Sequence, residues 1–269
     1  MDLLNPPRLD KQSVAKFFDN AAKSYDKSAI FQEEVRNRLL DRLDYMRHRA
    51  ETIVDLGCGT GGAIGRLQAA YPRARVCAVD IAPRMLESAG ARFRLWSKKR
   101  RVVADMERLP FADASFDLVF SSLALPWCND LAQSLGEMAR IARPGGLLLF
   151  SSLGPGTLRE LALAWQSLDD YPHVHRFIDM HDVGDAMLRT GFSQPVVDAE
   201  LIRLEYRDFN GLLEDLRNTG ASNADRERQR GLVTPSRLRA LETSYRQHGF
   251  EGDRFVASCE VIYGHAWVS

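Results

Sequence analysis

Short apolar runs alternate with helical segments between residues 52 and 152, and this alternation constrains the fold more than any other feature of the sequence. Five runs are predicted to be strands: 52–56, 75–79, 101–104, 116–121 and 147–152. Helices are predicted between them at 63–70, 83–94 and 131–141. Strands that alternate with helices at such spacing form parallel sheets with helices on both faces. We therefore predict a doubly wound α/β domain.

The segments on either side are predicted to extend this domain. Residues 1–50 are expected to form an N-terminal helical cap, with helices at 11–23 and 28–49. Beyond residue 152, helices are predicted at 157–168, 180–190, 212–216 and 235–248, and strands at 195–206 and 255–268. These two strands bring the expected sheet to seven strands, most of them parallel. Residues 51–269 would then form one Rossmann-like domain with a helical lid insertion at 207–250.

The composition argues against several classes of protein. The chain contains 36 Lys+Arg and 36 Asp+Glu, a balance that argues against nucleic acid as the main partner. No apolar stretch approaches the roughly 20 residues of a membrane span, and the first residues lack the pattern of a signal peptide. The four cysteines have no zinc or redox spacing. We expect a cytoplasmic protein with reduced thiols, no metal site, and no membrane or nucleic-acid partner.

The loop VDLGCGTGG (54–62) follows the first predicted strand and admits two interpretations. Its glycines fit the dinucleotide fingerprint G-x-G-x-x-G, in which a helix N-terminus faces a pyrophosphate. Asp55, however, would bring a carboxylate close to that phosphate. A carboxylate better suits a ligand with a cationic end, and S-adenosylmethionine carries a sulfonium and an amino group but no phosphate. Asp55 therefore favours S-adenosylmethionine over a nicotinamide dinucleotide.

Two further carboxylates end predicted strands of the same sheet. Asp80 closes the second strand about 20 residues beyond the glycines, where an acidic residue accepts hydrogen bonds from ribose hydroxyls. Asp105 closes the third strand, where it can accept from the exocyclic amine of adenine. Asp117, by contrast, is expected to anchor a loop rather than to contact a ligand. Together, Asp80 and Asp105 predict a nucleoside site beside the glycine loop.

The sequence resembles the class I S-adenosylmethionine-dependent methyltransferases in four segments that occur in order: VDLGCGTG (54–61), AVDIAPRML (78–86), ADMERLPFADASFDLVFSS (104–122) and RPGGLLLFSS (143–152). The resemblance implies that one set of residues surrounds the cofactor: Asp55, Gly57, Gly59, Asp80, Ile81, Met85, Asp105, Met106, Ser121 and Ser122.

Within this set, the resemblance implies different contacts. Asp55 and the first two glycines of the loop would surround the methionine moiety. Ile81 and Met85 would pack near the ribose, although Met85 also suits a core position. Met106 would help to recognise adenine, and one of the two serines that end the fourth strand would line the methyl-transfer cleft.

Further segments narrow the resemblance to the malonyl-[acyl-carrier protein] O-methyltransferase family of biotin synthesis. The similar segments are AAKSYD (21–26), SSLALPWCNDL (121–131), FSSLGPGTLREL (150–161), RFIDMHDVGDA (176–186) and GFSQPVVDAE (191–200). The chain departs from that family at Ser122, where Asn is frequent, and at Pro126, where Gln is frequent. The resemblance implies an acyl carrier protein carrying a malonyl group as the partner and methyl acceptor.

The chemistry of this acceptor limits the catalytic residues that are needed. The free malonyl carboxylate is ionised at pH 7 and can attack the sulfonium methyl in line, so no general base is required. Proximity and orientation are then the main contributions of the enzyme. Arg176 is the candidate cation for the carboxylate, with a surface or ion-pair arginine as the alternative. Tyr25 is expected to lie over the cofactor and to help close the site.

Two other functions remain open from the sequence. SSLALPW (121–127) also resembles a group of mitochondrial complex I assembly factors, which hydroxylate an arginine on the same kind of sheet. The third possibility is a C-methyltransferase that acts on a small molecule such as a quinone or sterol. That chemistry usually needs a base, so a deep apolar pocket with a buried acidic or histidine side chain would support it. A lone arginine near the methyl group would support the carboxylate acceptor.

An acidic carrier protein is expected to meet a basic patch. The densest basic run comprises Arg92, Arg94, Lys98, Lys99, Arg100 and Arg101. Alternative patches are formed by Arg203 with Arg207 and by the charged insertion, which contains Arg226, Arg228 and Arg230. The sequence does not choose among them.

Overall fold

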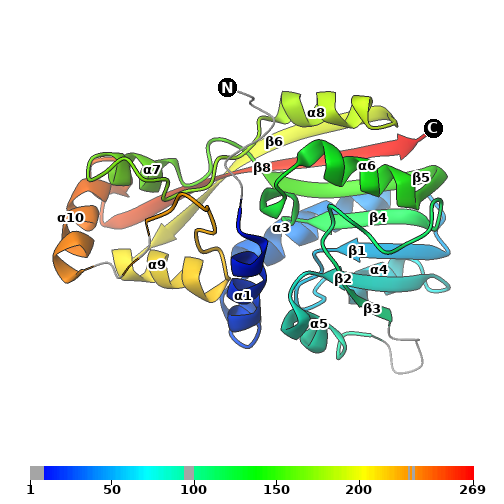
Figure 1. Cartoon of the computed structure of the whole chain (residues 1–269), viewed down its shortest axis with the longest axis horizontal. Coiled ribbons are helices and arrows are strands. Elements are labelled where there is room, and N and C mark those ends of the chain that lie inside the picture. Colours follow the sequence, from blue (N-terminus) through cyan, green and yellow to red (C-terminus); the bar gives the residue numbers. More distant parts are fainter. Residues whose placement is uncertain (1–8, 94–99, 230, 232–233) are drawn as a thin grey trace.

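The predicted parallel sheet is present in a computed structural model that describes residues 9–93, 100–229, 231 and 234–269 (Figure 1). Strand β1 (Thr52–Leu56) lies between β2 (Arg75–Asp80) and β4 (Phe116–Ser122). Strand β3 (Arg100–Val103) pairs with β2, and β5 (Ala142–Leu153) pairs with β4. All four pairings are parallel. Every residue of β1 is buried, as expected of a central strand with helices on both faces.

Two long antiparallel strands extend the sheet. Strand β8 (Arg254–Val268) pairs with β5, and β6 (Phe192–Tyr206) pairs with β8, which gives the order β3-β2-β1-β4-β5-β8-β6. The prediction of seven strands needs one correction, because β7 (Phe250–Glu251) also pairs with β8 and makes the mixed sheet eight-stranded. Strand β5 also begins before residue 147, since left-handed Gly145 (φ +74°) accommodates a shift in register against β4.

Helices cover both faces of the sheet. Helices α6 (Leu131–Ile141) and α8 (Met180–Arg189) contribute to the core on one face. Helices α3 (Ile30–Asp41), α4 (Ile64–Ala70) and α5 (Pro83–Ala89) contribute to the core on the other. The predicted doubly wound architecture is therefore confirmed.

The N-terminal helices differ from the prediction in one place. Helix α1 (Lys11–Ala21) agrees closely with its predicted range. The single helix predicted at 28–49 is wrong, because the chain instead forms α2 (Tyr25–Ser28), α3 and the 3-10 helix η1 (Arg42–Tyr45). Ala29 has a non-helical ψ of 41° between α2 and α3. The resulting break sets Tyr25 apart from the long helix.

Helices α7 (Arg159–Gln166), α9 (Phe209–Asn218) and α10 (Pro235–Tyr245) lie at one end of the long strands β6 and β8, away from the parallel strands (Figure 1). They enclose an aromatic cluster that includes Phe209 and Tyr245. Helix α9 is longer than the predicted 212–216, since the Asp208 side chain caps its start by accepting a hydrogen bond from the Gly211 N–H. We call this region the C-terminal lobe.

Two expectations from composition can be compared with the fold. All four cysteines are buried and free of disulfides, as expected of reduced thiols. Within the part of the chain that the structure describes, no helix combines the length and hydropathy needed to cross a membrane.

Candidate cofactor and acceptor site

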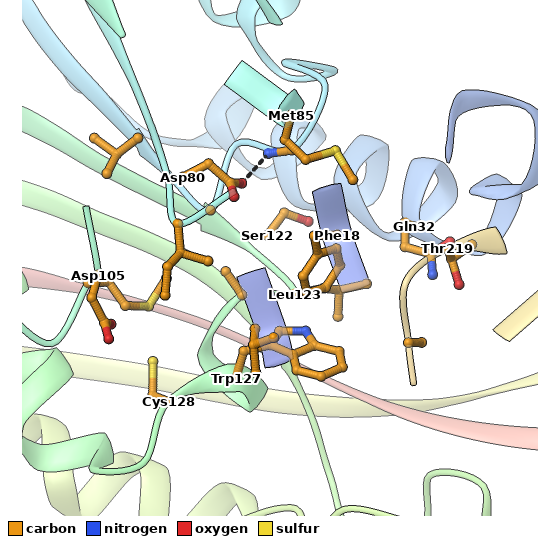
Figure 2. A pocket seen from close by; sticks show the side chains of 18 of the residues that line it. Phe18, Gln32, Asp80, Met85, Asp105, Ser122, Leu123, Trp127, Cys128 and Thr219 are labelled. Carbon is orange, nitrogen blue, oxygen red and sulfur yellow. Dashed lines mark hydrogen bonds between the residues drawn. The ribbon is translucent and has the colours of Figure 1, made fainter. Parts of the chain in front are cut away.

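A cavity with about 930 Å³ of empty space, its mouth included, opens at the carboxyl ends of β1, β2 and β4. Ligands bind at this edge in open α/β sheets. Its lining includes Gly57 from the loop after β1, Asp80 from the end of β2 and Ser122 from the end of β4. Figure 2 shows Asp105 and Gln32 on opposite sides of it. We call it the cofactor cavity.

The loop after β1 brings backbone, rather than side chains, to the cavity. Gly57 (φ +67°) and Gly59 (φ +53°) are left-handed, a conformation that glycine adopts without steric cost. A Cβ on Gly57 would overlap the Cβ of Ala124. Glycine is needed at position 62 for a different reason, because a Cβ there would overlap the guanidinium of Arg36. Two glycines therefore shape the cavity, whereas the third makes room for a neighbouring helix.

Asp80 is fixed by the loop that it faces. Its Oδ2 accepts a hydrogen bond from the Gly59 N–H at 2.8 Å, and its Oδ1 accepts from the Ala82 N–H at 2.8 Å. Burial raises the pKa of this carboxyl to about 6, and the backbone hydrogen bonds oppose the rise. Each oxygen can accept further hydrogen bonds. The position suits the predicted contact with ribose hydroxyls (Figure 2).

Asp55 lies in a smaller pocket that continues from the cofactor cavity behind the glycine loop. Its Oδ2 is buried and has no hydrogen-bond partner among the described residues. Burial raises the pKa of this carboxyl to about 7, and the nearby Arg36 guanidinium opposes the rise. Arg36 comes from α3 and also has a buried Nε without a described partner. This paired arrangement of a carboxyl and a guanidinium matches the amino and carboxylate groups of an amino acid.

Asp105 has a partner that the sequence analysis did not anticipate. Lys11, at the start of α1, approaches its Oδ1 to 3.0 Å and also forms an ion pair with Glu107. Both Lys11 and Asp105 line the cofactor cavity. No local motif marks Lys11, because it is separated from Asp105 by 94 positions. The carboxylate of Asp105 remains available to accept from an adenine amine through its other oxygen.

The remaining predicted cofactor residues are not all at the cavity. Ile81, Met85 and Met106 line it, although Met85 is fully buried and also packs against α1. Ser122 lines it as well. Ser121 is buried elsewhere, with its hydroxyl donating to the Leu56 carbonyl at 3.0 Å. Side chains of a strand alternate between faces, so only one of the adjacent serines reaches the cavity.

Tyr25 lies over the glycine loop. A Cβ on Gly59 would be 3.9 Å from Tyr25 Cε1. The next residue holds this position, because the Asp26 carboxylate accepts a hydrogen bond from the Thr60 hydroxyl at 2.5 Å and pairs with Arg92. Burial raises the pKa of Tyr25 to about 12, so its hydroxyl stays protonated at neutral pH. Tyr25 can therefore donate a hydrogen bond into the cofactor cavity.

A second cavity, with about 860 Å³ of empty space, lies between the cofactor cavity and the C-terminal lobe. We call it the acceptor cavity. It shares six lining residues with the cofactor cavity: Phe31, Gln32, Trp127, Leu153, Thr219 and Ala221. Trp127 packs edge-on against Phe18 on one side and His175 on the other, with ring centroids 5.0 Å apart in each pair. Pro126 fits this wall, because it lies in the first turn of the 3-10 helix η2 (Leu125–Trp127).

The histidines and the aspartate that line the acceptor cavity are already engaged with neighbouring groups. The described lining contains no lysine or arginine, although we expected a cation there. His175 Nε2 accepts a hydrogen bond from the Ala224 N–H at 3.0 Å, and burial lowers the pKa of this imidazole to about 4. Asp215 accepts a hydrogen bond from the Tyr206 hydroxyl at 2.8 Å. Neither His175 nor Asp215 is therefore free to act as a simple base.

Gln32 is a polar side chain at the junction of the cavities. It lines the cofactor cavity, the acceptor cavity and the pocket that holds Asp55. Its amide oxygen is buried and has no hydrogen-bond partner among the described residues. Figure 2 shows the amide directed towards Thr219, away from Asp105. Sequence reasoning missed Gln32, because one glutamine in an amphipathic helix carries no distinguishing pattern.

Arg176 lines neither cavity. It is exposed and lines a groove on the outer side of segment 172–177, while His175 and Phe177 line both that groove and the acceptor cavity. Asp117, as predicted, anchors a loop, since its carboxylate accepts from the Glu51 and Thr52 N–H groups.

Some arginines of the basic patches suggested by the sequence are paired with carboxylates. Arg92 pairs with Asp26, and Arg203 pairs with Glu251 at 2.5 Å. Four basic residues of these patches lie outside the described residues: Arg94, Lys98, Lys99 and Arg230.

Comparison with known proteins identifies a matching family model, similar proteins and a solved structure with a similar fold. Residues 54–150 match a family model described as a methyltransferase domain. A malonyl-[acyl-carrier protein] O-methyltransferase of Methylovorus sp. is 45% identical, over 96% of this chain and 89% of that protein. The protein of the same name from Halorhodospira halophila is also 45% identical, over 96% and 88%. The fold is similar to that in a crystal structure of geranyl diphosphate C-methyltransferase from Streptomyces coelicolor, which was solved in complex with S-adenosyl-L-homocysteine. The TM-score is 0.52 at 16% sequence identity, and the match covers 86% of this chain and 79% of that one.

Proposed function

The chain belongs to the malonyl-[acyl-carrier protein] O-methyltransferase family, and we propose that it transfers the methyl group of S-adenosylmethionine to the free carboxylate of malonyl-[acyl-carrier protein], an early step of biotin synthesis. One observation carries this proposal. A cavity suited to the cofactor joins an apolar acceptor cavity at Gln32 and Trp127, without a free general base at the junction. A carboxylate acceptor needs none.

The cofactor would lie along the carboxyl ends of the parallel strands. Asp105 and Met106 would bind adenine, and Asp80 would accept from the ribose hydroxyls. Asp55 and Arg36 would bind the amino and carboxylate groups of the methionine moiety; in support, each has a buried polar atom without a described partner. The sulfonium methyl would then point past Trp127 into the acceptor cavity.

The residues of this chain would supply orientation rather than proton transfer. The malonyl oxygen attacks the methyl carbon while the carbon–sulfur bond breaks, which yields a methyl ester and S-adenosylhomocysteine. Holding the reactants in line can supply about 7–11 kcal/mol of the barrier. Tyr25 lines the cofactor cavity and Gln32 lines both cavities, so the Tyr25 hydroxyl and the Gln32 amide would be neutral donors for the acceptor carboxylate. Neutral donors orient the nucleophile without quenching its charge in an ion pair.

Segment 207–250 would close the acceptor cavity as a lid. Leu212, Leu216, Thr219 and Ala221 all line it. The chain beyond α9 is held against the wall at residues 172–175, because Asn223 Nδ2 donates to the Pro172 carbonyl. Residues 1–50 would form the helical cap on the cofactor side, through Tyr25 and the helices around it.

The alternative C-methyltransferase is not favoured. Among the described lining residues its base would have to come from His173, His175 or Asp215, and all three are engaged with neighbouring groups. The arginine hydroxylase is not favoured either, since the relatives that match along 96% of the chain are named as O-methyltransferases.

The proposal is tested with S-adenosylmethionine labelled in the methyl group and two loaded carriers, malonyl and acetyl. We expect label on the malonyl carrier only, in a form released by mild base, because an acetyl group offers no free carboxylate. Equal labelling of both carriers, or labelling of neither, would contradict the proposal.

A further inference from the structure

The acceptor cavity is flanked on its outer side by a groove between α7 and segment 169–177, which we call the outer groove. The outer groove and the acceptor cavity share Thr157 and residues of segment 173–177 as a common wall. That segment lies in a stretch without helix or strand between α7 and α8. We propose that the acidic carrier protein docks at the outer groove on Arg159 and Arg176, and that its pantetheine arm enters the acceptor cavity across this wall; the inference rests on the proposed function.

Two unpaired guanidinium groups mark the outer groove. Arg159, at the start of α7, and Arg176 both line the groove and are exposed. Neither forms an ion pair or a side-chain hydrogen bond with a described residue, whereas Arg38 and Arg237 do. Unpaired arginines suit a phosphodiester and surface carboxylates, which they bind in bidentate fashion.

The outer groove also contains three carboxylates, and some of them are offset by neighbouring cations. Asp169 is already engaged, because it accepts hydrogen bonds from Arg237 and from His173. Asp170 and Glu227 are exposed, and the exposed Arg226 is adjacent to Glu227 in sequence. The outer groove is thus roughly neutral in total, with its positive charge concentrated on two free arginines.

An exposed aromatic side chain lies in the same groove. Tyr171 is 53% exposed, next to the partly buried Pro172. Protein interfaces are enriched in tyrosine and arginine. Free arginines and an exposed tyrosine together give this face the composition of a docking surface.

The other flank of the acceptor cavity is acidic, unlike the outer groove. A groove between α3, β6 and α9 shares Phe31, Leu204, Tyr206 and Asp215 with the cavity. Its acidic lining residues are Glu33, Glu34, Glu205, Glu214 and Asp215. The one basic lining residue, Arg38, is paired with Glu34 and Glu200. An acidic carrier would be repelled here, so the two flanks together select the outer groove.

This docking site gives Arg176 a different role from the one that the sequence suggested. It would hold the carrier at the entrance instead of the malonyl carboxylate at the methyl group. The other basic patches are weaker candidates, since none of their described residues lines the outer groove or the acceptor cavity, and Arg92 and Arg203 are already paired with carboxylates.

Charge reversal in the full chain tests the proposal. We expect R159E/R176E to raise KM for malonyl-acyl carrier protein at least about tenfold, with a much smaller change for malonyl-pantetheine, which lacks both phosphate and protein. Added salt should raise KM for the carrier in the wild-type enzyme and less so in the variant. An unchanged dissociation constant for S-adenosylmethionine would establish that the variant is folded.

Two matched controls make the result specific. R73E changes an exposed arginine in the turn before β2, a strand far from β8 and β6 in the sheet order, and should leave KM for the carrier unchanged. E34R/E214R reverses the charge of two residues on the acidic flank and should not raise KM for the carrier. If R159E/R176E leaves KM for the carrier unchanged while the wild-type enzyme is active, the docking site is wrong and the function stands. A wild-type enzyme inactive on both malonyl thioesters would instead overturn the function, and the docking site with it.

Discussion

The two cavities of this protein are built in different ways. The cofactor cavity is shaped largely by backbone, with left-handed glycines after β1 and an Asp80 carboxylate held by two N–H groups. The acceptor cavity is lined by side chains from segments as distant as Phe31 and Cys259. Recognition of the cofactor is therefore concentrated in a few local motifs, whereas selection of the acceptor depends on how distant segments pack.

Gly57→Ala should have the largest effect of the substitutions that test this difference, because it changes the backbone that shapes the cofactor cavity. The new Cβ would require a left-handed alanine, which costs about 1–2 kcal/mol, and would also overlap Ala124, which adds about 1–3 kcal/mol. We expect the affinity for S-adenosylmethionine to fall by about 100-fold or more, as measured by calorimetry. Gly65→Ala is the control, since a Cβ there meets nothing within 4 Å. Equal losses in both variants would show that the backbone of the loop is not what defines the cofactor cavity.

Asp55→Asn should weaken cofactor binding less and should alter its pH dependence. The pKa of Asp55 is raised to about 7 by burial, so the wild-type carboxyl is protonated below that pH and cannot attract the amino group. Affinity for S-adenosylmethionine should therefore rise as pH increases from about 6 to about 8. The asparagine variant should lose about 10–100-fold at pH 8, as expected for a charged hydrogen bond, and should show a flatter profile. A profile as steep as that of the wild-type enzyme would exclude Asp55 as its source.

Gln32→Glu should have the smallest effect of the three, and this effect should be on binding of the acceptor rather than of the cofactor. A carboxylate at the junction would repel the malonyl carboxylate, so we expect KM for malonyl-acyl carrier protein to rise roughly tenfold, about 1.4 kcal/mol. The dissociation constant for S-adenosylmethionine should change little. Gln32→Met, which has a similar volume and no charge, should raise KM less than Gln32→Glu. A larger loss with methionine than with glutamate would mean that hydrogen bonding by the side chain, rather than charge repulsion, decides the affinity for the acceptor at this position.

The elements that the sequence predicted best are those with local causes. Strand β1 and helix α6 have the predicted bounds, because a buried apolar run and a capped amphipathic pattern are each complete within a few residues. The helix predicted at 28–49 was wrong at its ends, since a break at Ala29 leaves no strong trace in an apolar pattern. The short strand β7 was missed because two residues show no periodicity.

The same distinction applies to the site. Asp80, Asp105 and the glycines follow strand ends, where position in sequence predicts position in the sheet. Lys11, Gln32 and Arg36 were missed, because their roles arise only when N-terminal helices pack over the sheet. Ser121 and Ser122 could not be separated from the sequence, since the orientation of a strand relative to the cavity decides which of the two faces it.

The sequence alone determined the fold class, the edge of the sheet where the cofactor would bind, and the family resemblance that the relatives confirm. These depend on local patterns of hydrophobicity, glycine and charge. Tertiary structure alone decided that Arg176 lies outside the acceptor cavity, that Gln32 lies at the junction, and that the two flanks of the cavity differ in charge. The reason is physical: a cavity exists only between packed segments, and burial and charge there belong to the whole arrangement rather than to any one stretch of chain.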